Sequence, residues 1–203
     1  MQKTIITISR QFGAGGRELG KKLAGQLNIP YYDKELLSKA AKDSGLTQEF
    51  IEHYDEKHTS SLLYNLAMTP HLMLDSLGTS WEDMAVKATK EAILSAAENS
   101  CVIVGRNADF ILRNEAGLFR IFITANKEQR IARIVARDKV SAEEAEKKMY
   151  RMDKARAANY SYYTNQNWGQ AENYDLCLNL SKISLEKAIR LIMDCVNERR
   201  TEK

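Results

Sequence analysis

Short apolar, β-branched runs alternate with longer amphipathic stretches along the chain. The runs lie at residues 4–9, 29–32, 101–104, 118–124 and 174–180. The run at 101–104 is apolar throughout, as expected of a strand that is covered on both faces. Strands that alternate with helices are typically parallel and joined by right-handed crossovers. The pattern therefore predicts one α/β domain with a five-stranded parallel sheet.

The amphipathic stretches predict the helices. One begins after the first strand, and others are expected at 81–98, 127–138, 141–160 and 185–196. The stretch at 141–160 opens with Ser141-x-x-Glu144, which is a capping box. We interpret residues 1–203 as a single domain, with helical excursions at about 34–80 and 138–172.

Composition narrows the class of protein. The 203 residues suit one domain, and 44% hydrophobic with 28% charged residues is ordinary for a globular chain. A net charge of +3 points neither to nucleic acid nor to a membrane surface, and no apolar run approaches the ~18 residues that span a bilayer. The three cysteines, Cys101, Cys177 and Cys195, lie in apolar segments without metal-like spacing, so we expect them to be reduced and buried in a cytoplasmic protein.

A glycine-rich turn between the first strand and the first helix is the leading candidate for chemistry. It comprises Gly13, Ala14, Gly15 and Gly16. Backbone N–H groups at such a helix N-terminus can cradle a phosphate. The usual phosphate-binding pattern, however, has glycine where this chain has Arg10, lysine at Gly16, and a hydroxyl residue near Glu18. The alternative is a turn that merely packs closely, but its place after a strand of an α/β sheet favours a ligand site.

Two arginines beside the turn can supply the missing charge. Arg10 precedes the glycines, whereas Arg17 lies in the first helical turn, close to the N–H groups. Arginine presents a planar fork that suits phosphate oxygens, and we favour Arg17 for this role. Glu18 would either stay near magnesium through water or serve as a first-turn acid favoured by the helix dipole.

Further arginines are candidates for the same site. Arg106 directly follows the strand at 101–104, where a charged side chain faces the ligand crevice. One helix face carries Arg130, Arg133 and Arg137. Either all three are exposed to solvent, or at least one of them points inward to the site.

Several acidic and aromatic residues could have either a structural or a functional role. Asp33 would either cap a helix or orient an acceptor, and Asp153 with Arg156 would form either a helix ion pair or part of the site. Packing is favoured over base stacking for the aromatic residues Tyr160, Tyr162, Tyr163 and Trp168. The three histidines have no spacing that suggests a metal site or a triad.

Taken together, these residues resemble the nucleoside monophosphate kinases, and cytidylate kinases most closely. The segments that carry the resemblance are 13–15, 31–33, 102–106, 122–125 with Glu128, Arg130 and Arg133, and Asp153-x-x-Arg156. It implies a three-layer α/β/α P-loop fold that binds ATP with Mg²⁺ and transfers a phosphoryl group to a small phosphorylated acceptor. It also implies that residues 13–16 with Arg10, Arg17 and Glu18 bind ATP, and that Asp33, Arg106, Arg130 and Asp153 bind the acceptor. Arg17, Arg106, Arg133 and Arg156 would take part in transfer beneath a helical lid.

The chain departs from that family at three positions. The loop lysine is Gly16, the family's Gly-Arg-Asp is Gly105-Arg106-Asn107, and an arginine expected before Asp153 is Met149. These departures resemble the divergent branch called cytidylate kinase-like proteins.

Two functions therefore stay open. The retained arginines favour an ATP-dependent kinase, whereas the missing lysine favours a nucleotide-binding module without transfer chemistry. RNA binding by the basic, aromatic stretch 147–168 is a third alternative that the net charge does not support. We expect a nucleotide and a phosphorylated acceptor as partners, with no membrane and no nucleic acid, and leave the oligomeric state open.

Overall fold

A five-stranded parallel sheet forms the centre of the protein. The computed structural model describes residues 3–33, 36, 38, 42–43 and 81–201. The strands are β1 (Ile5–Arg10), β2 (Tyr31–Tyr32), β3 (Cys101–Val104), β4 (Leu118–Thr124) and β5 (Leu176–Asn179). Their order is β2-β3-β1-β4-β5, and every neighbouring pair is parallel. The central strand β1 therefore ends beside the carboxyl ends of both β3 and β4.

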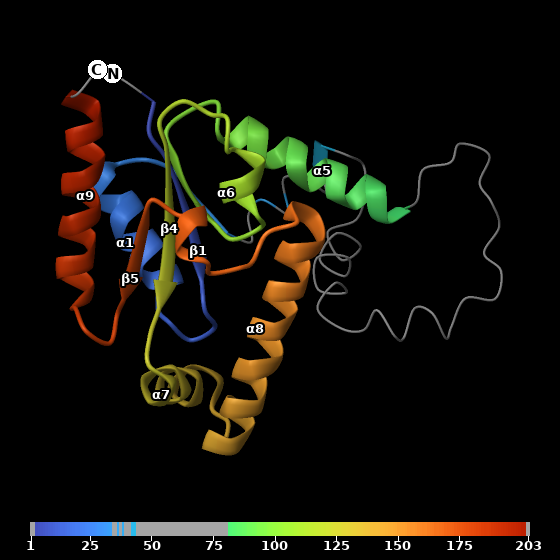
Figure 1. Ribbon diagram of the computed structural model, residues 1–203, viewed down its shortest axis with the longest axis vertical. Helices are drawn as coiled ribbons and strands as arrows, with labels where there is room; N and C mark the ends of the chain where they lie inside the picture. The colour runs from blue at the N-terminus through green and yellow to red at the C-terminus, as the bar shows by residue number, and fades with distance from the viewer. Residues whose placement is uncertain (1–2, 34–35, 37, 39–41, 44–80, 202–203) are drawn as a thin grey trace.

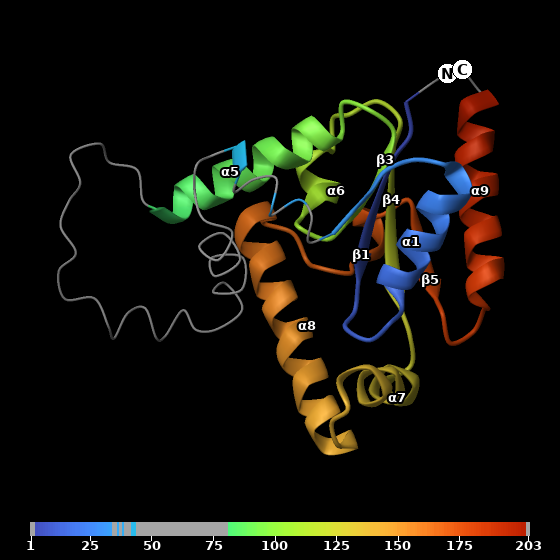
Figure 2. The same ribbon diagram turned by 180° about the vertical axis from the view of Figure 1, so that it is seen from behind.

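Helices cover both faces of this sheet and make the fold a three-layer α/β/α sandwich. They are α1 (Gly16–Leu27), α5 (Trp81–Ala96), α6 (Ala108–Ile111), α7 (Lys127–Asp138), α8 (Ala142–Thr164), a 3-10 turn η1 (Ala171–Asn173) and α9 (Leu185–Thr201). α1 and α9 lie on one face, and α5 and α6 lie on the other with α8 beside them (Figures 1 and 2). α7 lies beyond the carboxyl end of β4, below the sheet in Figure 1.

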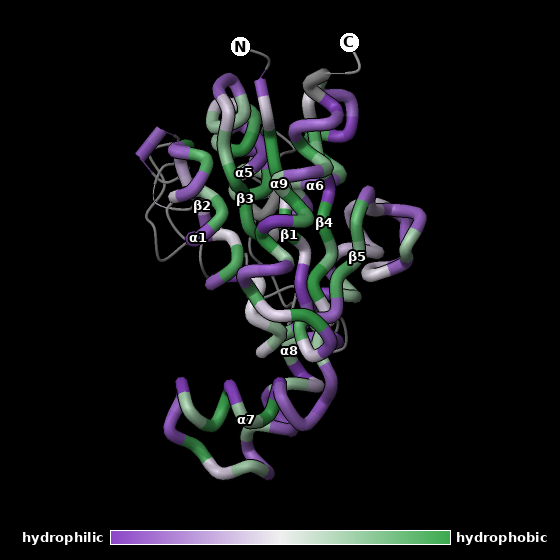
Figure 3. The backbone as a smooth tube through the Cα atoms, turned by 90° about the vertical axis from the view of Figure 1, so that its left-hand side faces the viewer, coloured by the Kyte–Doolittle hydropathy of each residue, from purple (hydrophilic) through white to green (hydrophobic). Residues whose placement is uncertain are grey.

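Each face of the sheet has its own apolar core. Ile6 and Ile8 of β1 pack with Leu19 and Leu23 of α1 and with Ile189 of α9. On the opposite face, Ile5 of β1 and Ile103 of β3 pack with Ala92 and Ile93 of α5. This alternation along β1 is the two-residue period of a strand that is covered on both sides, and the tube is correspondingly hydrophobic along much of β3 and β4 (Figure 3).

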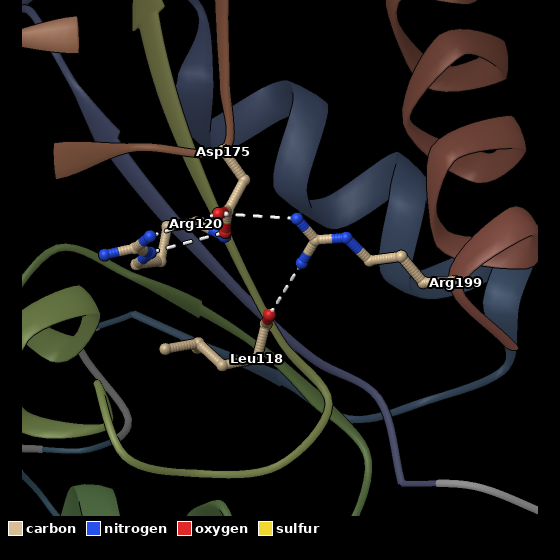
Figure 4. Close-up of polar contacts among 4 residues, drawn as sticks. All are labelled: Leu118, Arg120, Asp175 and Arg199. Carbon is tan, nitrogen blue, oxygen red and sulfur yellow. Dashed lines mark hydrogen bonds and ion pairs between the residues drawn. The ribbon is translucent and has the colours of Figure 1, made fainter. Parts of the chain in front are cut away.

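A charged clamp fastens the C-terminal helix at the amino ends of β4 and β5. The carboxylate of Asp175 accepts hydrogen bonds from Arg120 at 3.1 and 3.3 Å and lies 3.4 Å from Nη2 of Arg199 (Figure 4). Nη1 of Arg199 also donates to the carbonyl of Leu118 at 3.2 Å. The two guanidinium groups lower the pKa of Asp175 against the opposing effect of burial. The clamp lies at the edge of the sheet opposite the glycine turn, so it stabilises the fold away from that turn.

The predicted elements agree with most of this architecture. The expected parallel pairing of the first and third strands is confirmed by Ile5 opposite Cys101, and α7 has the predicted bounds. The capping box is also confirmed, because Ser141 and Glu144 exchange hydrogen bonds at 3.0 and 3.2 Å. α6 was not predicted, since four residues are too short to show a helical period. The predicted excursion at 34–80 lies almost entirely outside the described residues.

The expectation that all three cysteines are buried is wrong. All three are free, but only Cys101 is buried, whereas Cys195 is half-buried and Cys177 is exposed. Cys177 lies in β5, which is an edge strand. The next residue, Leu178, faces the core, so Cys177 points to the other face. Among the helices in the described part of the chain, none is long and apolar enough to cross a bilayer.

Candidate functional site

Arg10 connects the segments that follow three neighbouring strands. It is the last residue of β1, and its Nη2 atom lies 3.6 Å from Oδ1 of Asp33, which follows β2. Its Nη1 atom lies against Gly105, which follows β3, at 2.0 Å from the place where a Cβ atom would be. The Arg10 side chain is only 13% exposed. Since β1, β2 and β3 are parallel, their carboxyl ends meet at one edge of the sheet, and Arg10 crosses that edge.

Glycine at two positions makes room for this arginine. A Cβ atom on Gly16 would lie 2.8 Å from Cβ and 2.9 Å from Cγ of Arg10, closer than carbon atoms pack. Gly105 has a φ of +81°, a left-handed conformation that also favours glycine. Positions 10 and 16 are therefore sterically coupled, because a side chain at position 16 would collide with Arg10.

The start of α1 presents backbone donors. Gly15 is the N-cap residue, has a φ of +95°, and places no side chain over the helix end. Within the described residues, the N–H groups of Gly15, Gly16 and Arg17 donate to no protein acceptor. Unpaired N–H groups at a helix N-terminus carry partial positive charge and bind anions. The geometry predicted for the glycine turn is thus present without its lysine.

The carboxylate of Asp33 also pairs with the second candidate arginine. Nε of Arg17 lies 2.5 Å from Oδ2 of Asp33, while Arg10 approaches the other oxygen. Asp33 is buried, and the Arg17 side chain is half-exposed. The helix that Asp33 was expected to cap lies mostly outside the described residues, and within them Asp33 pairs with both arginines.

A second ion pair holds the glycine turn from the other side. The carboxylate of Asp153 accepts a hydrogen bond from the N–H of Phe12 at 2.7 Å and pairs with Arg130. Nε of Arg130 donates in turn to the carbonyl of Phe12 at 2.8 Å. The N–H and the carbonyl of Phe12 are therefore both bound by one largely buried ion pair, which connects α7 and α8 to the turn.

Two more arginines donate to backbone carbonyls of the same turn. Nη1 of Arg133 donates to the carbonyl of Ala14 at 3.0 Å, and Nη1 of Arg156 donates to the carbonyl of Arg10 at 2.8 Å. The expectation that at least one arginine of α7 turns inward is thus met by Arg130 and Arg133. Asp153 and Arg156 both bind the turn, and no ion pair joins them to each other among the described residues.

Positive charge around the turn exceeds negative charge. Of the side chains that the structure describes, five guanidinium groups and two carboxylates contact the turn and its flanks. They belong to Arg10, Arg17, Arg130, Arg133 and Arg156, and to Asp33 and Asp153. Burial, together with the neighbouring charge of Arg10, lowers the pKa of Arg156 to about 9. Burial likewise lowers the pKa of Arg10. A bound anion would relieve this repulsion, so the cluster favours a polyanionic ligand.

The turn after β3 is strained and carries Arg106. Gly105, Arg106 and Asn107 all have positive φ angles, of 81°, 62° and 52°. A left-handed residue other than glycine costs on the order of 1–3 kcal/mol, and such conformations gather at functional sites. Nδ2 of Asn107 donates to Oδ1 of Asn159 on α8 at 2.9 Å, which holds the turn against this helix.

A buried polar network docks the C-terminal part of α8. Asp109 of α6 accepts hydrogen bonds from Tyr160 at 2.7 Å and from Ser9 of β1 at 3.3 Å. Burial raises the pKa of Asp109, and burial together with this carboxylate raises the pKa of Tyr160. Asp109 was not among the residues predicted from the sequence, although an isolated acid in an apolar segment soon after a strand is a usable signal.

The aromatic residues of α8 and its following loop mostly pack, as favoured above. Tyr160 is buried, and Trp168 lies edge-on to Phe122 with ring centroids 5.3 Å apart. Tyr162 differs, because its side chain is 67% exposed. Packing therefore accounts for Tyr160 and Trp168 but leaves Tyr162 in solvent.

The described residues do not fit a magnesium ion held by the protein. In the usual pattern the metal-binding hydroxyl directly follows the lysine, so its position here is Arg17 and not Glu18. The Glu18 side chain is 63% exposed and lies 3.5 Å from Lys22. In the part of the chain that the structure describes, no cluster of three or more His, Cys, Asp or Glu side chains could hold a metal.

Comparisons with known proteins agree with this fold. The sequence model of the Cytidylate kinase-like family matches residues 5–182. The cytidylate kinase of Pyrococcus horikoshii is 24% identical over 196 residues, covering 96% of this chain and 89% of that protein. An uncharacterized protein from Eubacterium ventriosum is 28% identical, with a TM-score of 0.73 over 96% of this chain and 99% of the other. A shikimate kinase from Bacteroides thetaiotaomicron, 15% identical, shares the fold with a TM-score of 0.55 over 97% of this chain and 99% of the other. The protein, with its kinase fold and its arginine-rich glycine turn, belongs to the cytidylate kinase-like family.

Proposed function

We propose that the protein transfers the γ-phosphoryl group of ATP to a nucleoside monophosphate, CMP-like, or to another small phosphorylated acceptor. The observation that carries this proposal is the unpaired start of α1 surrounded by an excess of guanidinium groups. Phosphoryl transfer depends mainly on positioning and on neutralising charge, which such a site can do. The family match and the curated cytidylate kinase relatives support the same reaction.

In this proposal the triphosphate lies on the backbone of residues 13–16. The place of the family's lysine is taken by Arg10, because the stem of Arg10 fills the space next to Gly16. The sequence alone had favoured Arg17 for the role of this lysine. Arg17 is half-exposed and can swing from Asp33 toward the β- and γ-phosphates. Arg17 then exchanges this carboxylate for the polyanion, while Arg10 stays paired with Asp33.

The acceptor would bind at the turn after β3. Arg106 leaves this turn at the carboxyl edge of the sheet, where ligands of parallel sheets bind. A phosphate oxygen of the acceptor attacks the γ-phosphorus, and the bond from phosphorus to the β,γ-bridging oxygen breaks, releasing ADP. The attacking oxygen carries no proton that must be removed, so no general base is required. Arg156 and Arg133 keep the glycine turn in place while charge moves to the leaving oxygen.

A second function is favoured by a specific feature of the loop. Gly16 and Arg17 replace the lysine and the hydroxyl of the usual pattern, which act on the transferring group and its metal. A protein that binds nucleotide through the same cradle but does not transfer phosphate would keep the arginines for binding alone.

A coupled assay separates the two functions. Purified full-length protein is incubated with ATP, with and without Mg²⁺, and with each common nucleoside monophosphate, while ADP formation is followed. Acceptor-dependent ADP release supports the kinase. Calorimetric ATP binding without ADP release for any acceptor supports the binding module, and no binding at millimolar ATP would overturn both.

A further inference from the structure

Arg17 occupies the position at which the usual phosphate-binding loop presents its metal ligand. That ligand is a neutral hydroxyl, which can bind Mg²⁺, whereas a guanidinium is a cation with donors only. Nε of Arg17 lies 2.5 Å from Oδ2 of Asp33, so the guanidinium is held beside the start of α1. The cationic guanidinium of Arg17 thus occupies the sequence position whose side chain would otherwise bind a divalent cation.

The carboxylates near this position are already engaged. Asp33 is shared between Arg10 and Arg17, and Asp153 is bound to Arg130 and to the N–H of Phe12. A magnesium ion coordinated here would have to displace an arginine from a carboxylate.

The first-turn acid of α1 offers no alternative. The side chain of Glu18 is mostly exposed and lies beside Lys22, which is itself close to Glu186 of α9. Magnesium bound with a nucleotide takes most of its ligands from phosphates and water and needs only one or two from the protein, but Glu18 is paired with Lys22.

We propose that this site binds a nucleoside triphosphate without a magnesium ion coordinated by the protein, the guanidinium of Arg17 taking the place of that ion. This inference rests on the proposed nucleotide binding and deepens it. Arg17 moves from the carboxylate of Asp33 to oxygens of the β- and γ-phosphates, and Asp33 keeps Arg10. Added Mg²⁺ then competes with Arg17 for the same oxygens instead of strengthening the complex.

The experiment is an ATP titration of the full-length protein by calorimetry, once in EDTA and once in excess Mg²⁺. For the wild type we expect an affinity that is unchanged or weaker in Mg²⁺, within about threefold. Arg17→Thr restores the hydroxyl of the usual pattern. It should weaken binding in EDTA by roughly tenfold or more and recover part of that loss in Mg²⁺. Arg17→Lys retains a cation and should behave like the wild type, as should the control Arg190→Thr on the exposed side of α9.

The outcomes are distinct. Wild-type affinity that rises by about tenfold or more on adding Mg²⁺ overturns this inference and leaves nucleotide binding intact. Failure to bind ATP in both buffers overturns the proposed function itself. If Arg17→Thr does not fold, as judged by circular dichroism, the wild-type response to Mg²⁺ still decides the question.

Discussion

Position 16 can regain its lysine only if Arg10 is removed. In the wild type, a Cβ atom at position 16 would lie 2.8 Å from Cβ of Arg10, and overpacking of this kind typically costs about 1–3 kcal/mol. We therefore expect Gly16→Lys alone to destabilise the protein and to weaken ATP binding. Removing the arginine opens the space that the lysine needs.

The single change Arg10→Gly has its own cost. It removes an ion pair in which both side chains are largely buried, but Asp33 retains Arg17, so we expect a loss of about 2 kcal/mol, less than for an isolated buried pair. The double variant Arg10→Gly/Gly16→Lys should be more stable than the sum of the single effects by roughly 1–3 kcal/mol. It should also bind ATP more tightly than either single variant.

Urea unfolding and ATP calorimetry on all four proteins form a double-mutant cycle. Gly25→Lys is the matched control, because Gly25 lies on the same helix and a Cβ atom there would meet nothing within 4 Å. We expect this control to be neutral or slightly stabilising, since glycine is a poor helix former. Additive effects within about 0.5 kcal/mol would refute the steric coupling of positions 10 and 16.

Three further predictions concern other residues around the glycine turn and the sheet edge. Asp153→Asn should lower the melting temperature by roughly 4–12 °C, as expected for ~2–3 kcal/mol in a chain of this size, because it weakens the ion pair that holds Phe12; an unchanged calorimetric transition would contradict this role. Asp109 is buried with a raised pKa, so its protonated form stabilises the fold at low pH and this contribution is lost as pH rises through the folded-state pKa. Asp109→Asn should therefore gain stability relative to the wild type as pH rises above the ordinary pKa of an aspartate, and urea unfolding showing a constant difference would oppose this. Arg106→Ala should reduce kcat/KM for the acceptor by a factor that corresponds to ~2 kcal/mol, with ATP affinity unchanged; equal acceptor kinetics would remove Arg106 from the site.

Local pattern was enough to predict much of the architecture. The five strands were recognised from apolar runs whose period matches a covered sheet, and α7 and the capping box of α8 were recognised from residues within one or two helical turns. The position of Arg106 at the edge of the sheet followed because only Gly105 separates it from β3. These features depend on neighbours in the chain, which the sequence displays directly.

Contacts between distant segments were decided only by tertiary structure. Phe12 and Asp153 are 141 residues apart, and no local period indicates that a carboxylate on α8 holds the peptide group of Phe12. The burial of Asp109 depends on α8 returning to cover α6. The sequence showed by itself that Gly16 lacks the lysine. The reason appears only in the packed fold, where the side chain of Arg10 fills the space that a side chain at position 16 would need.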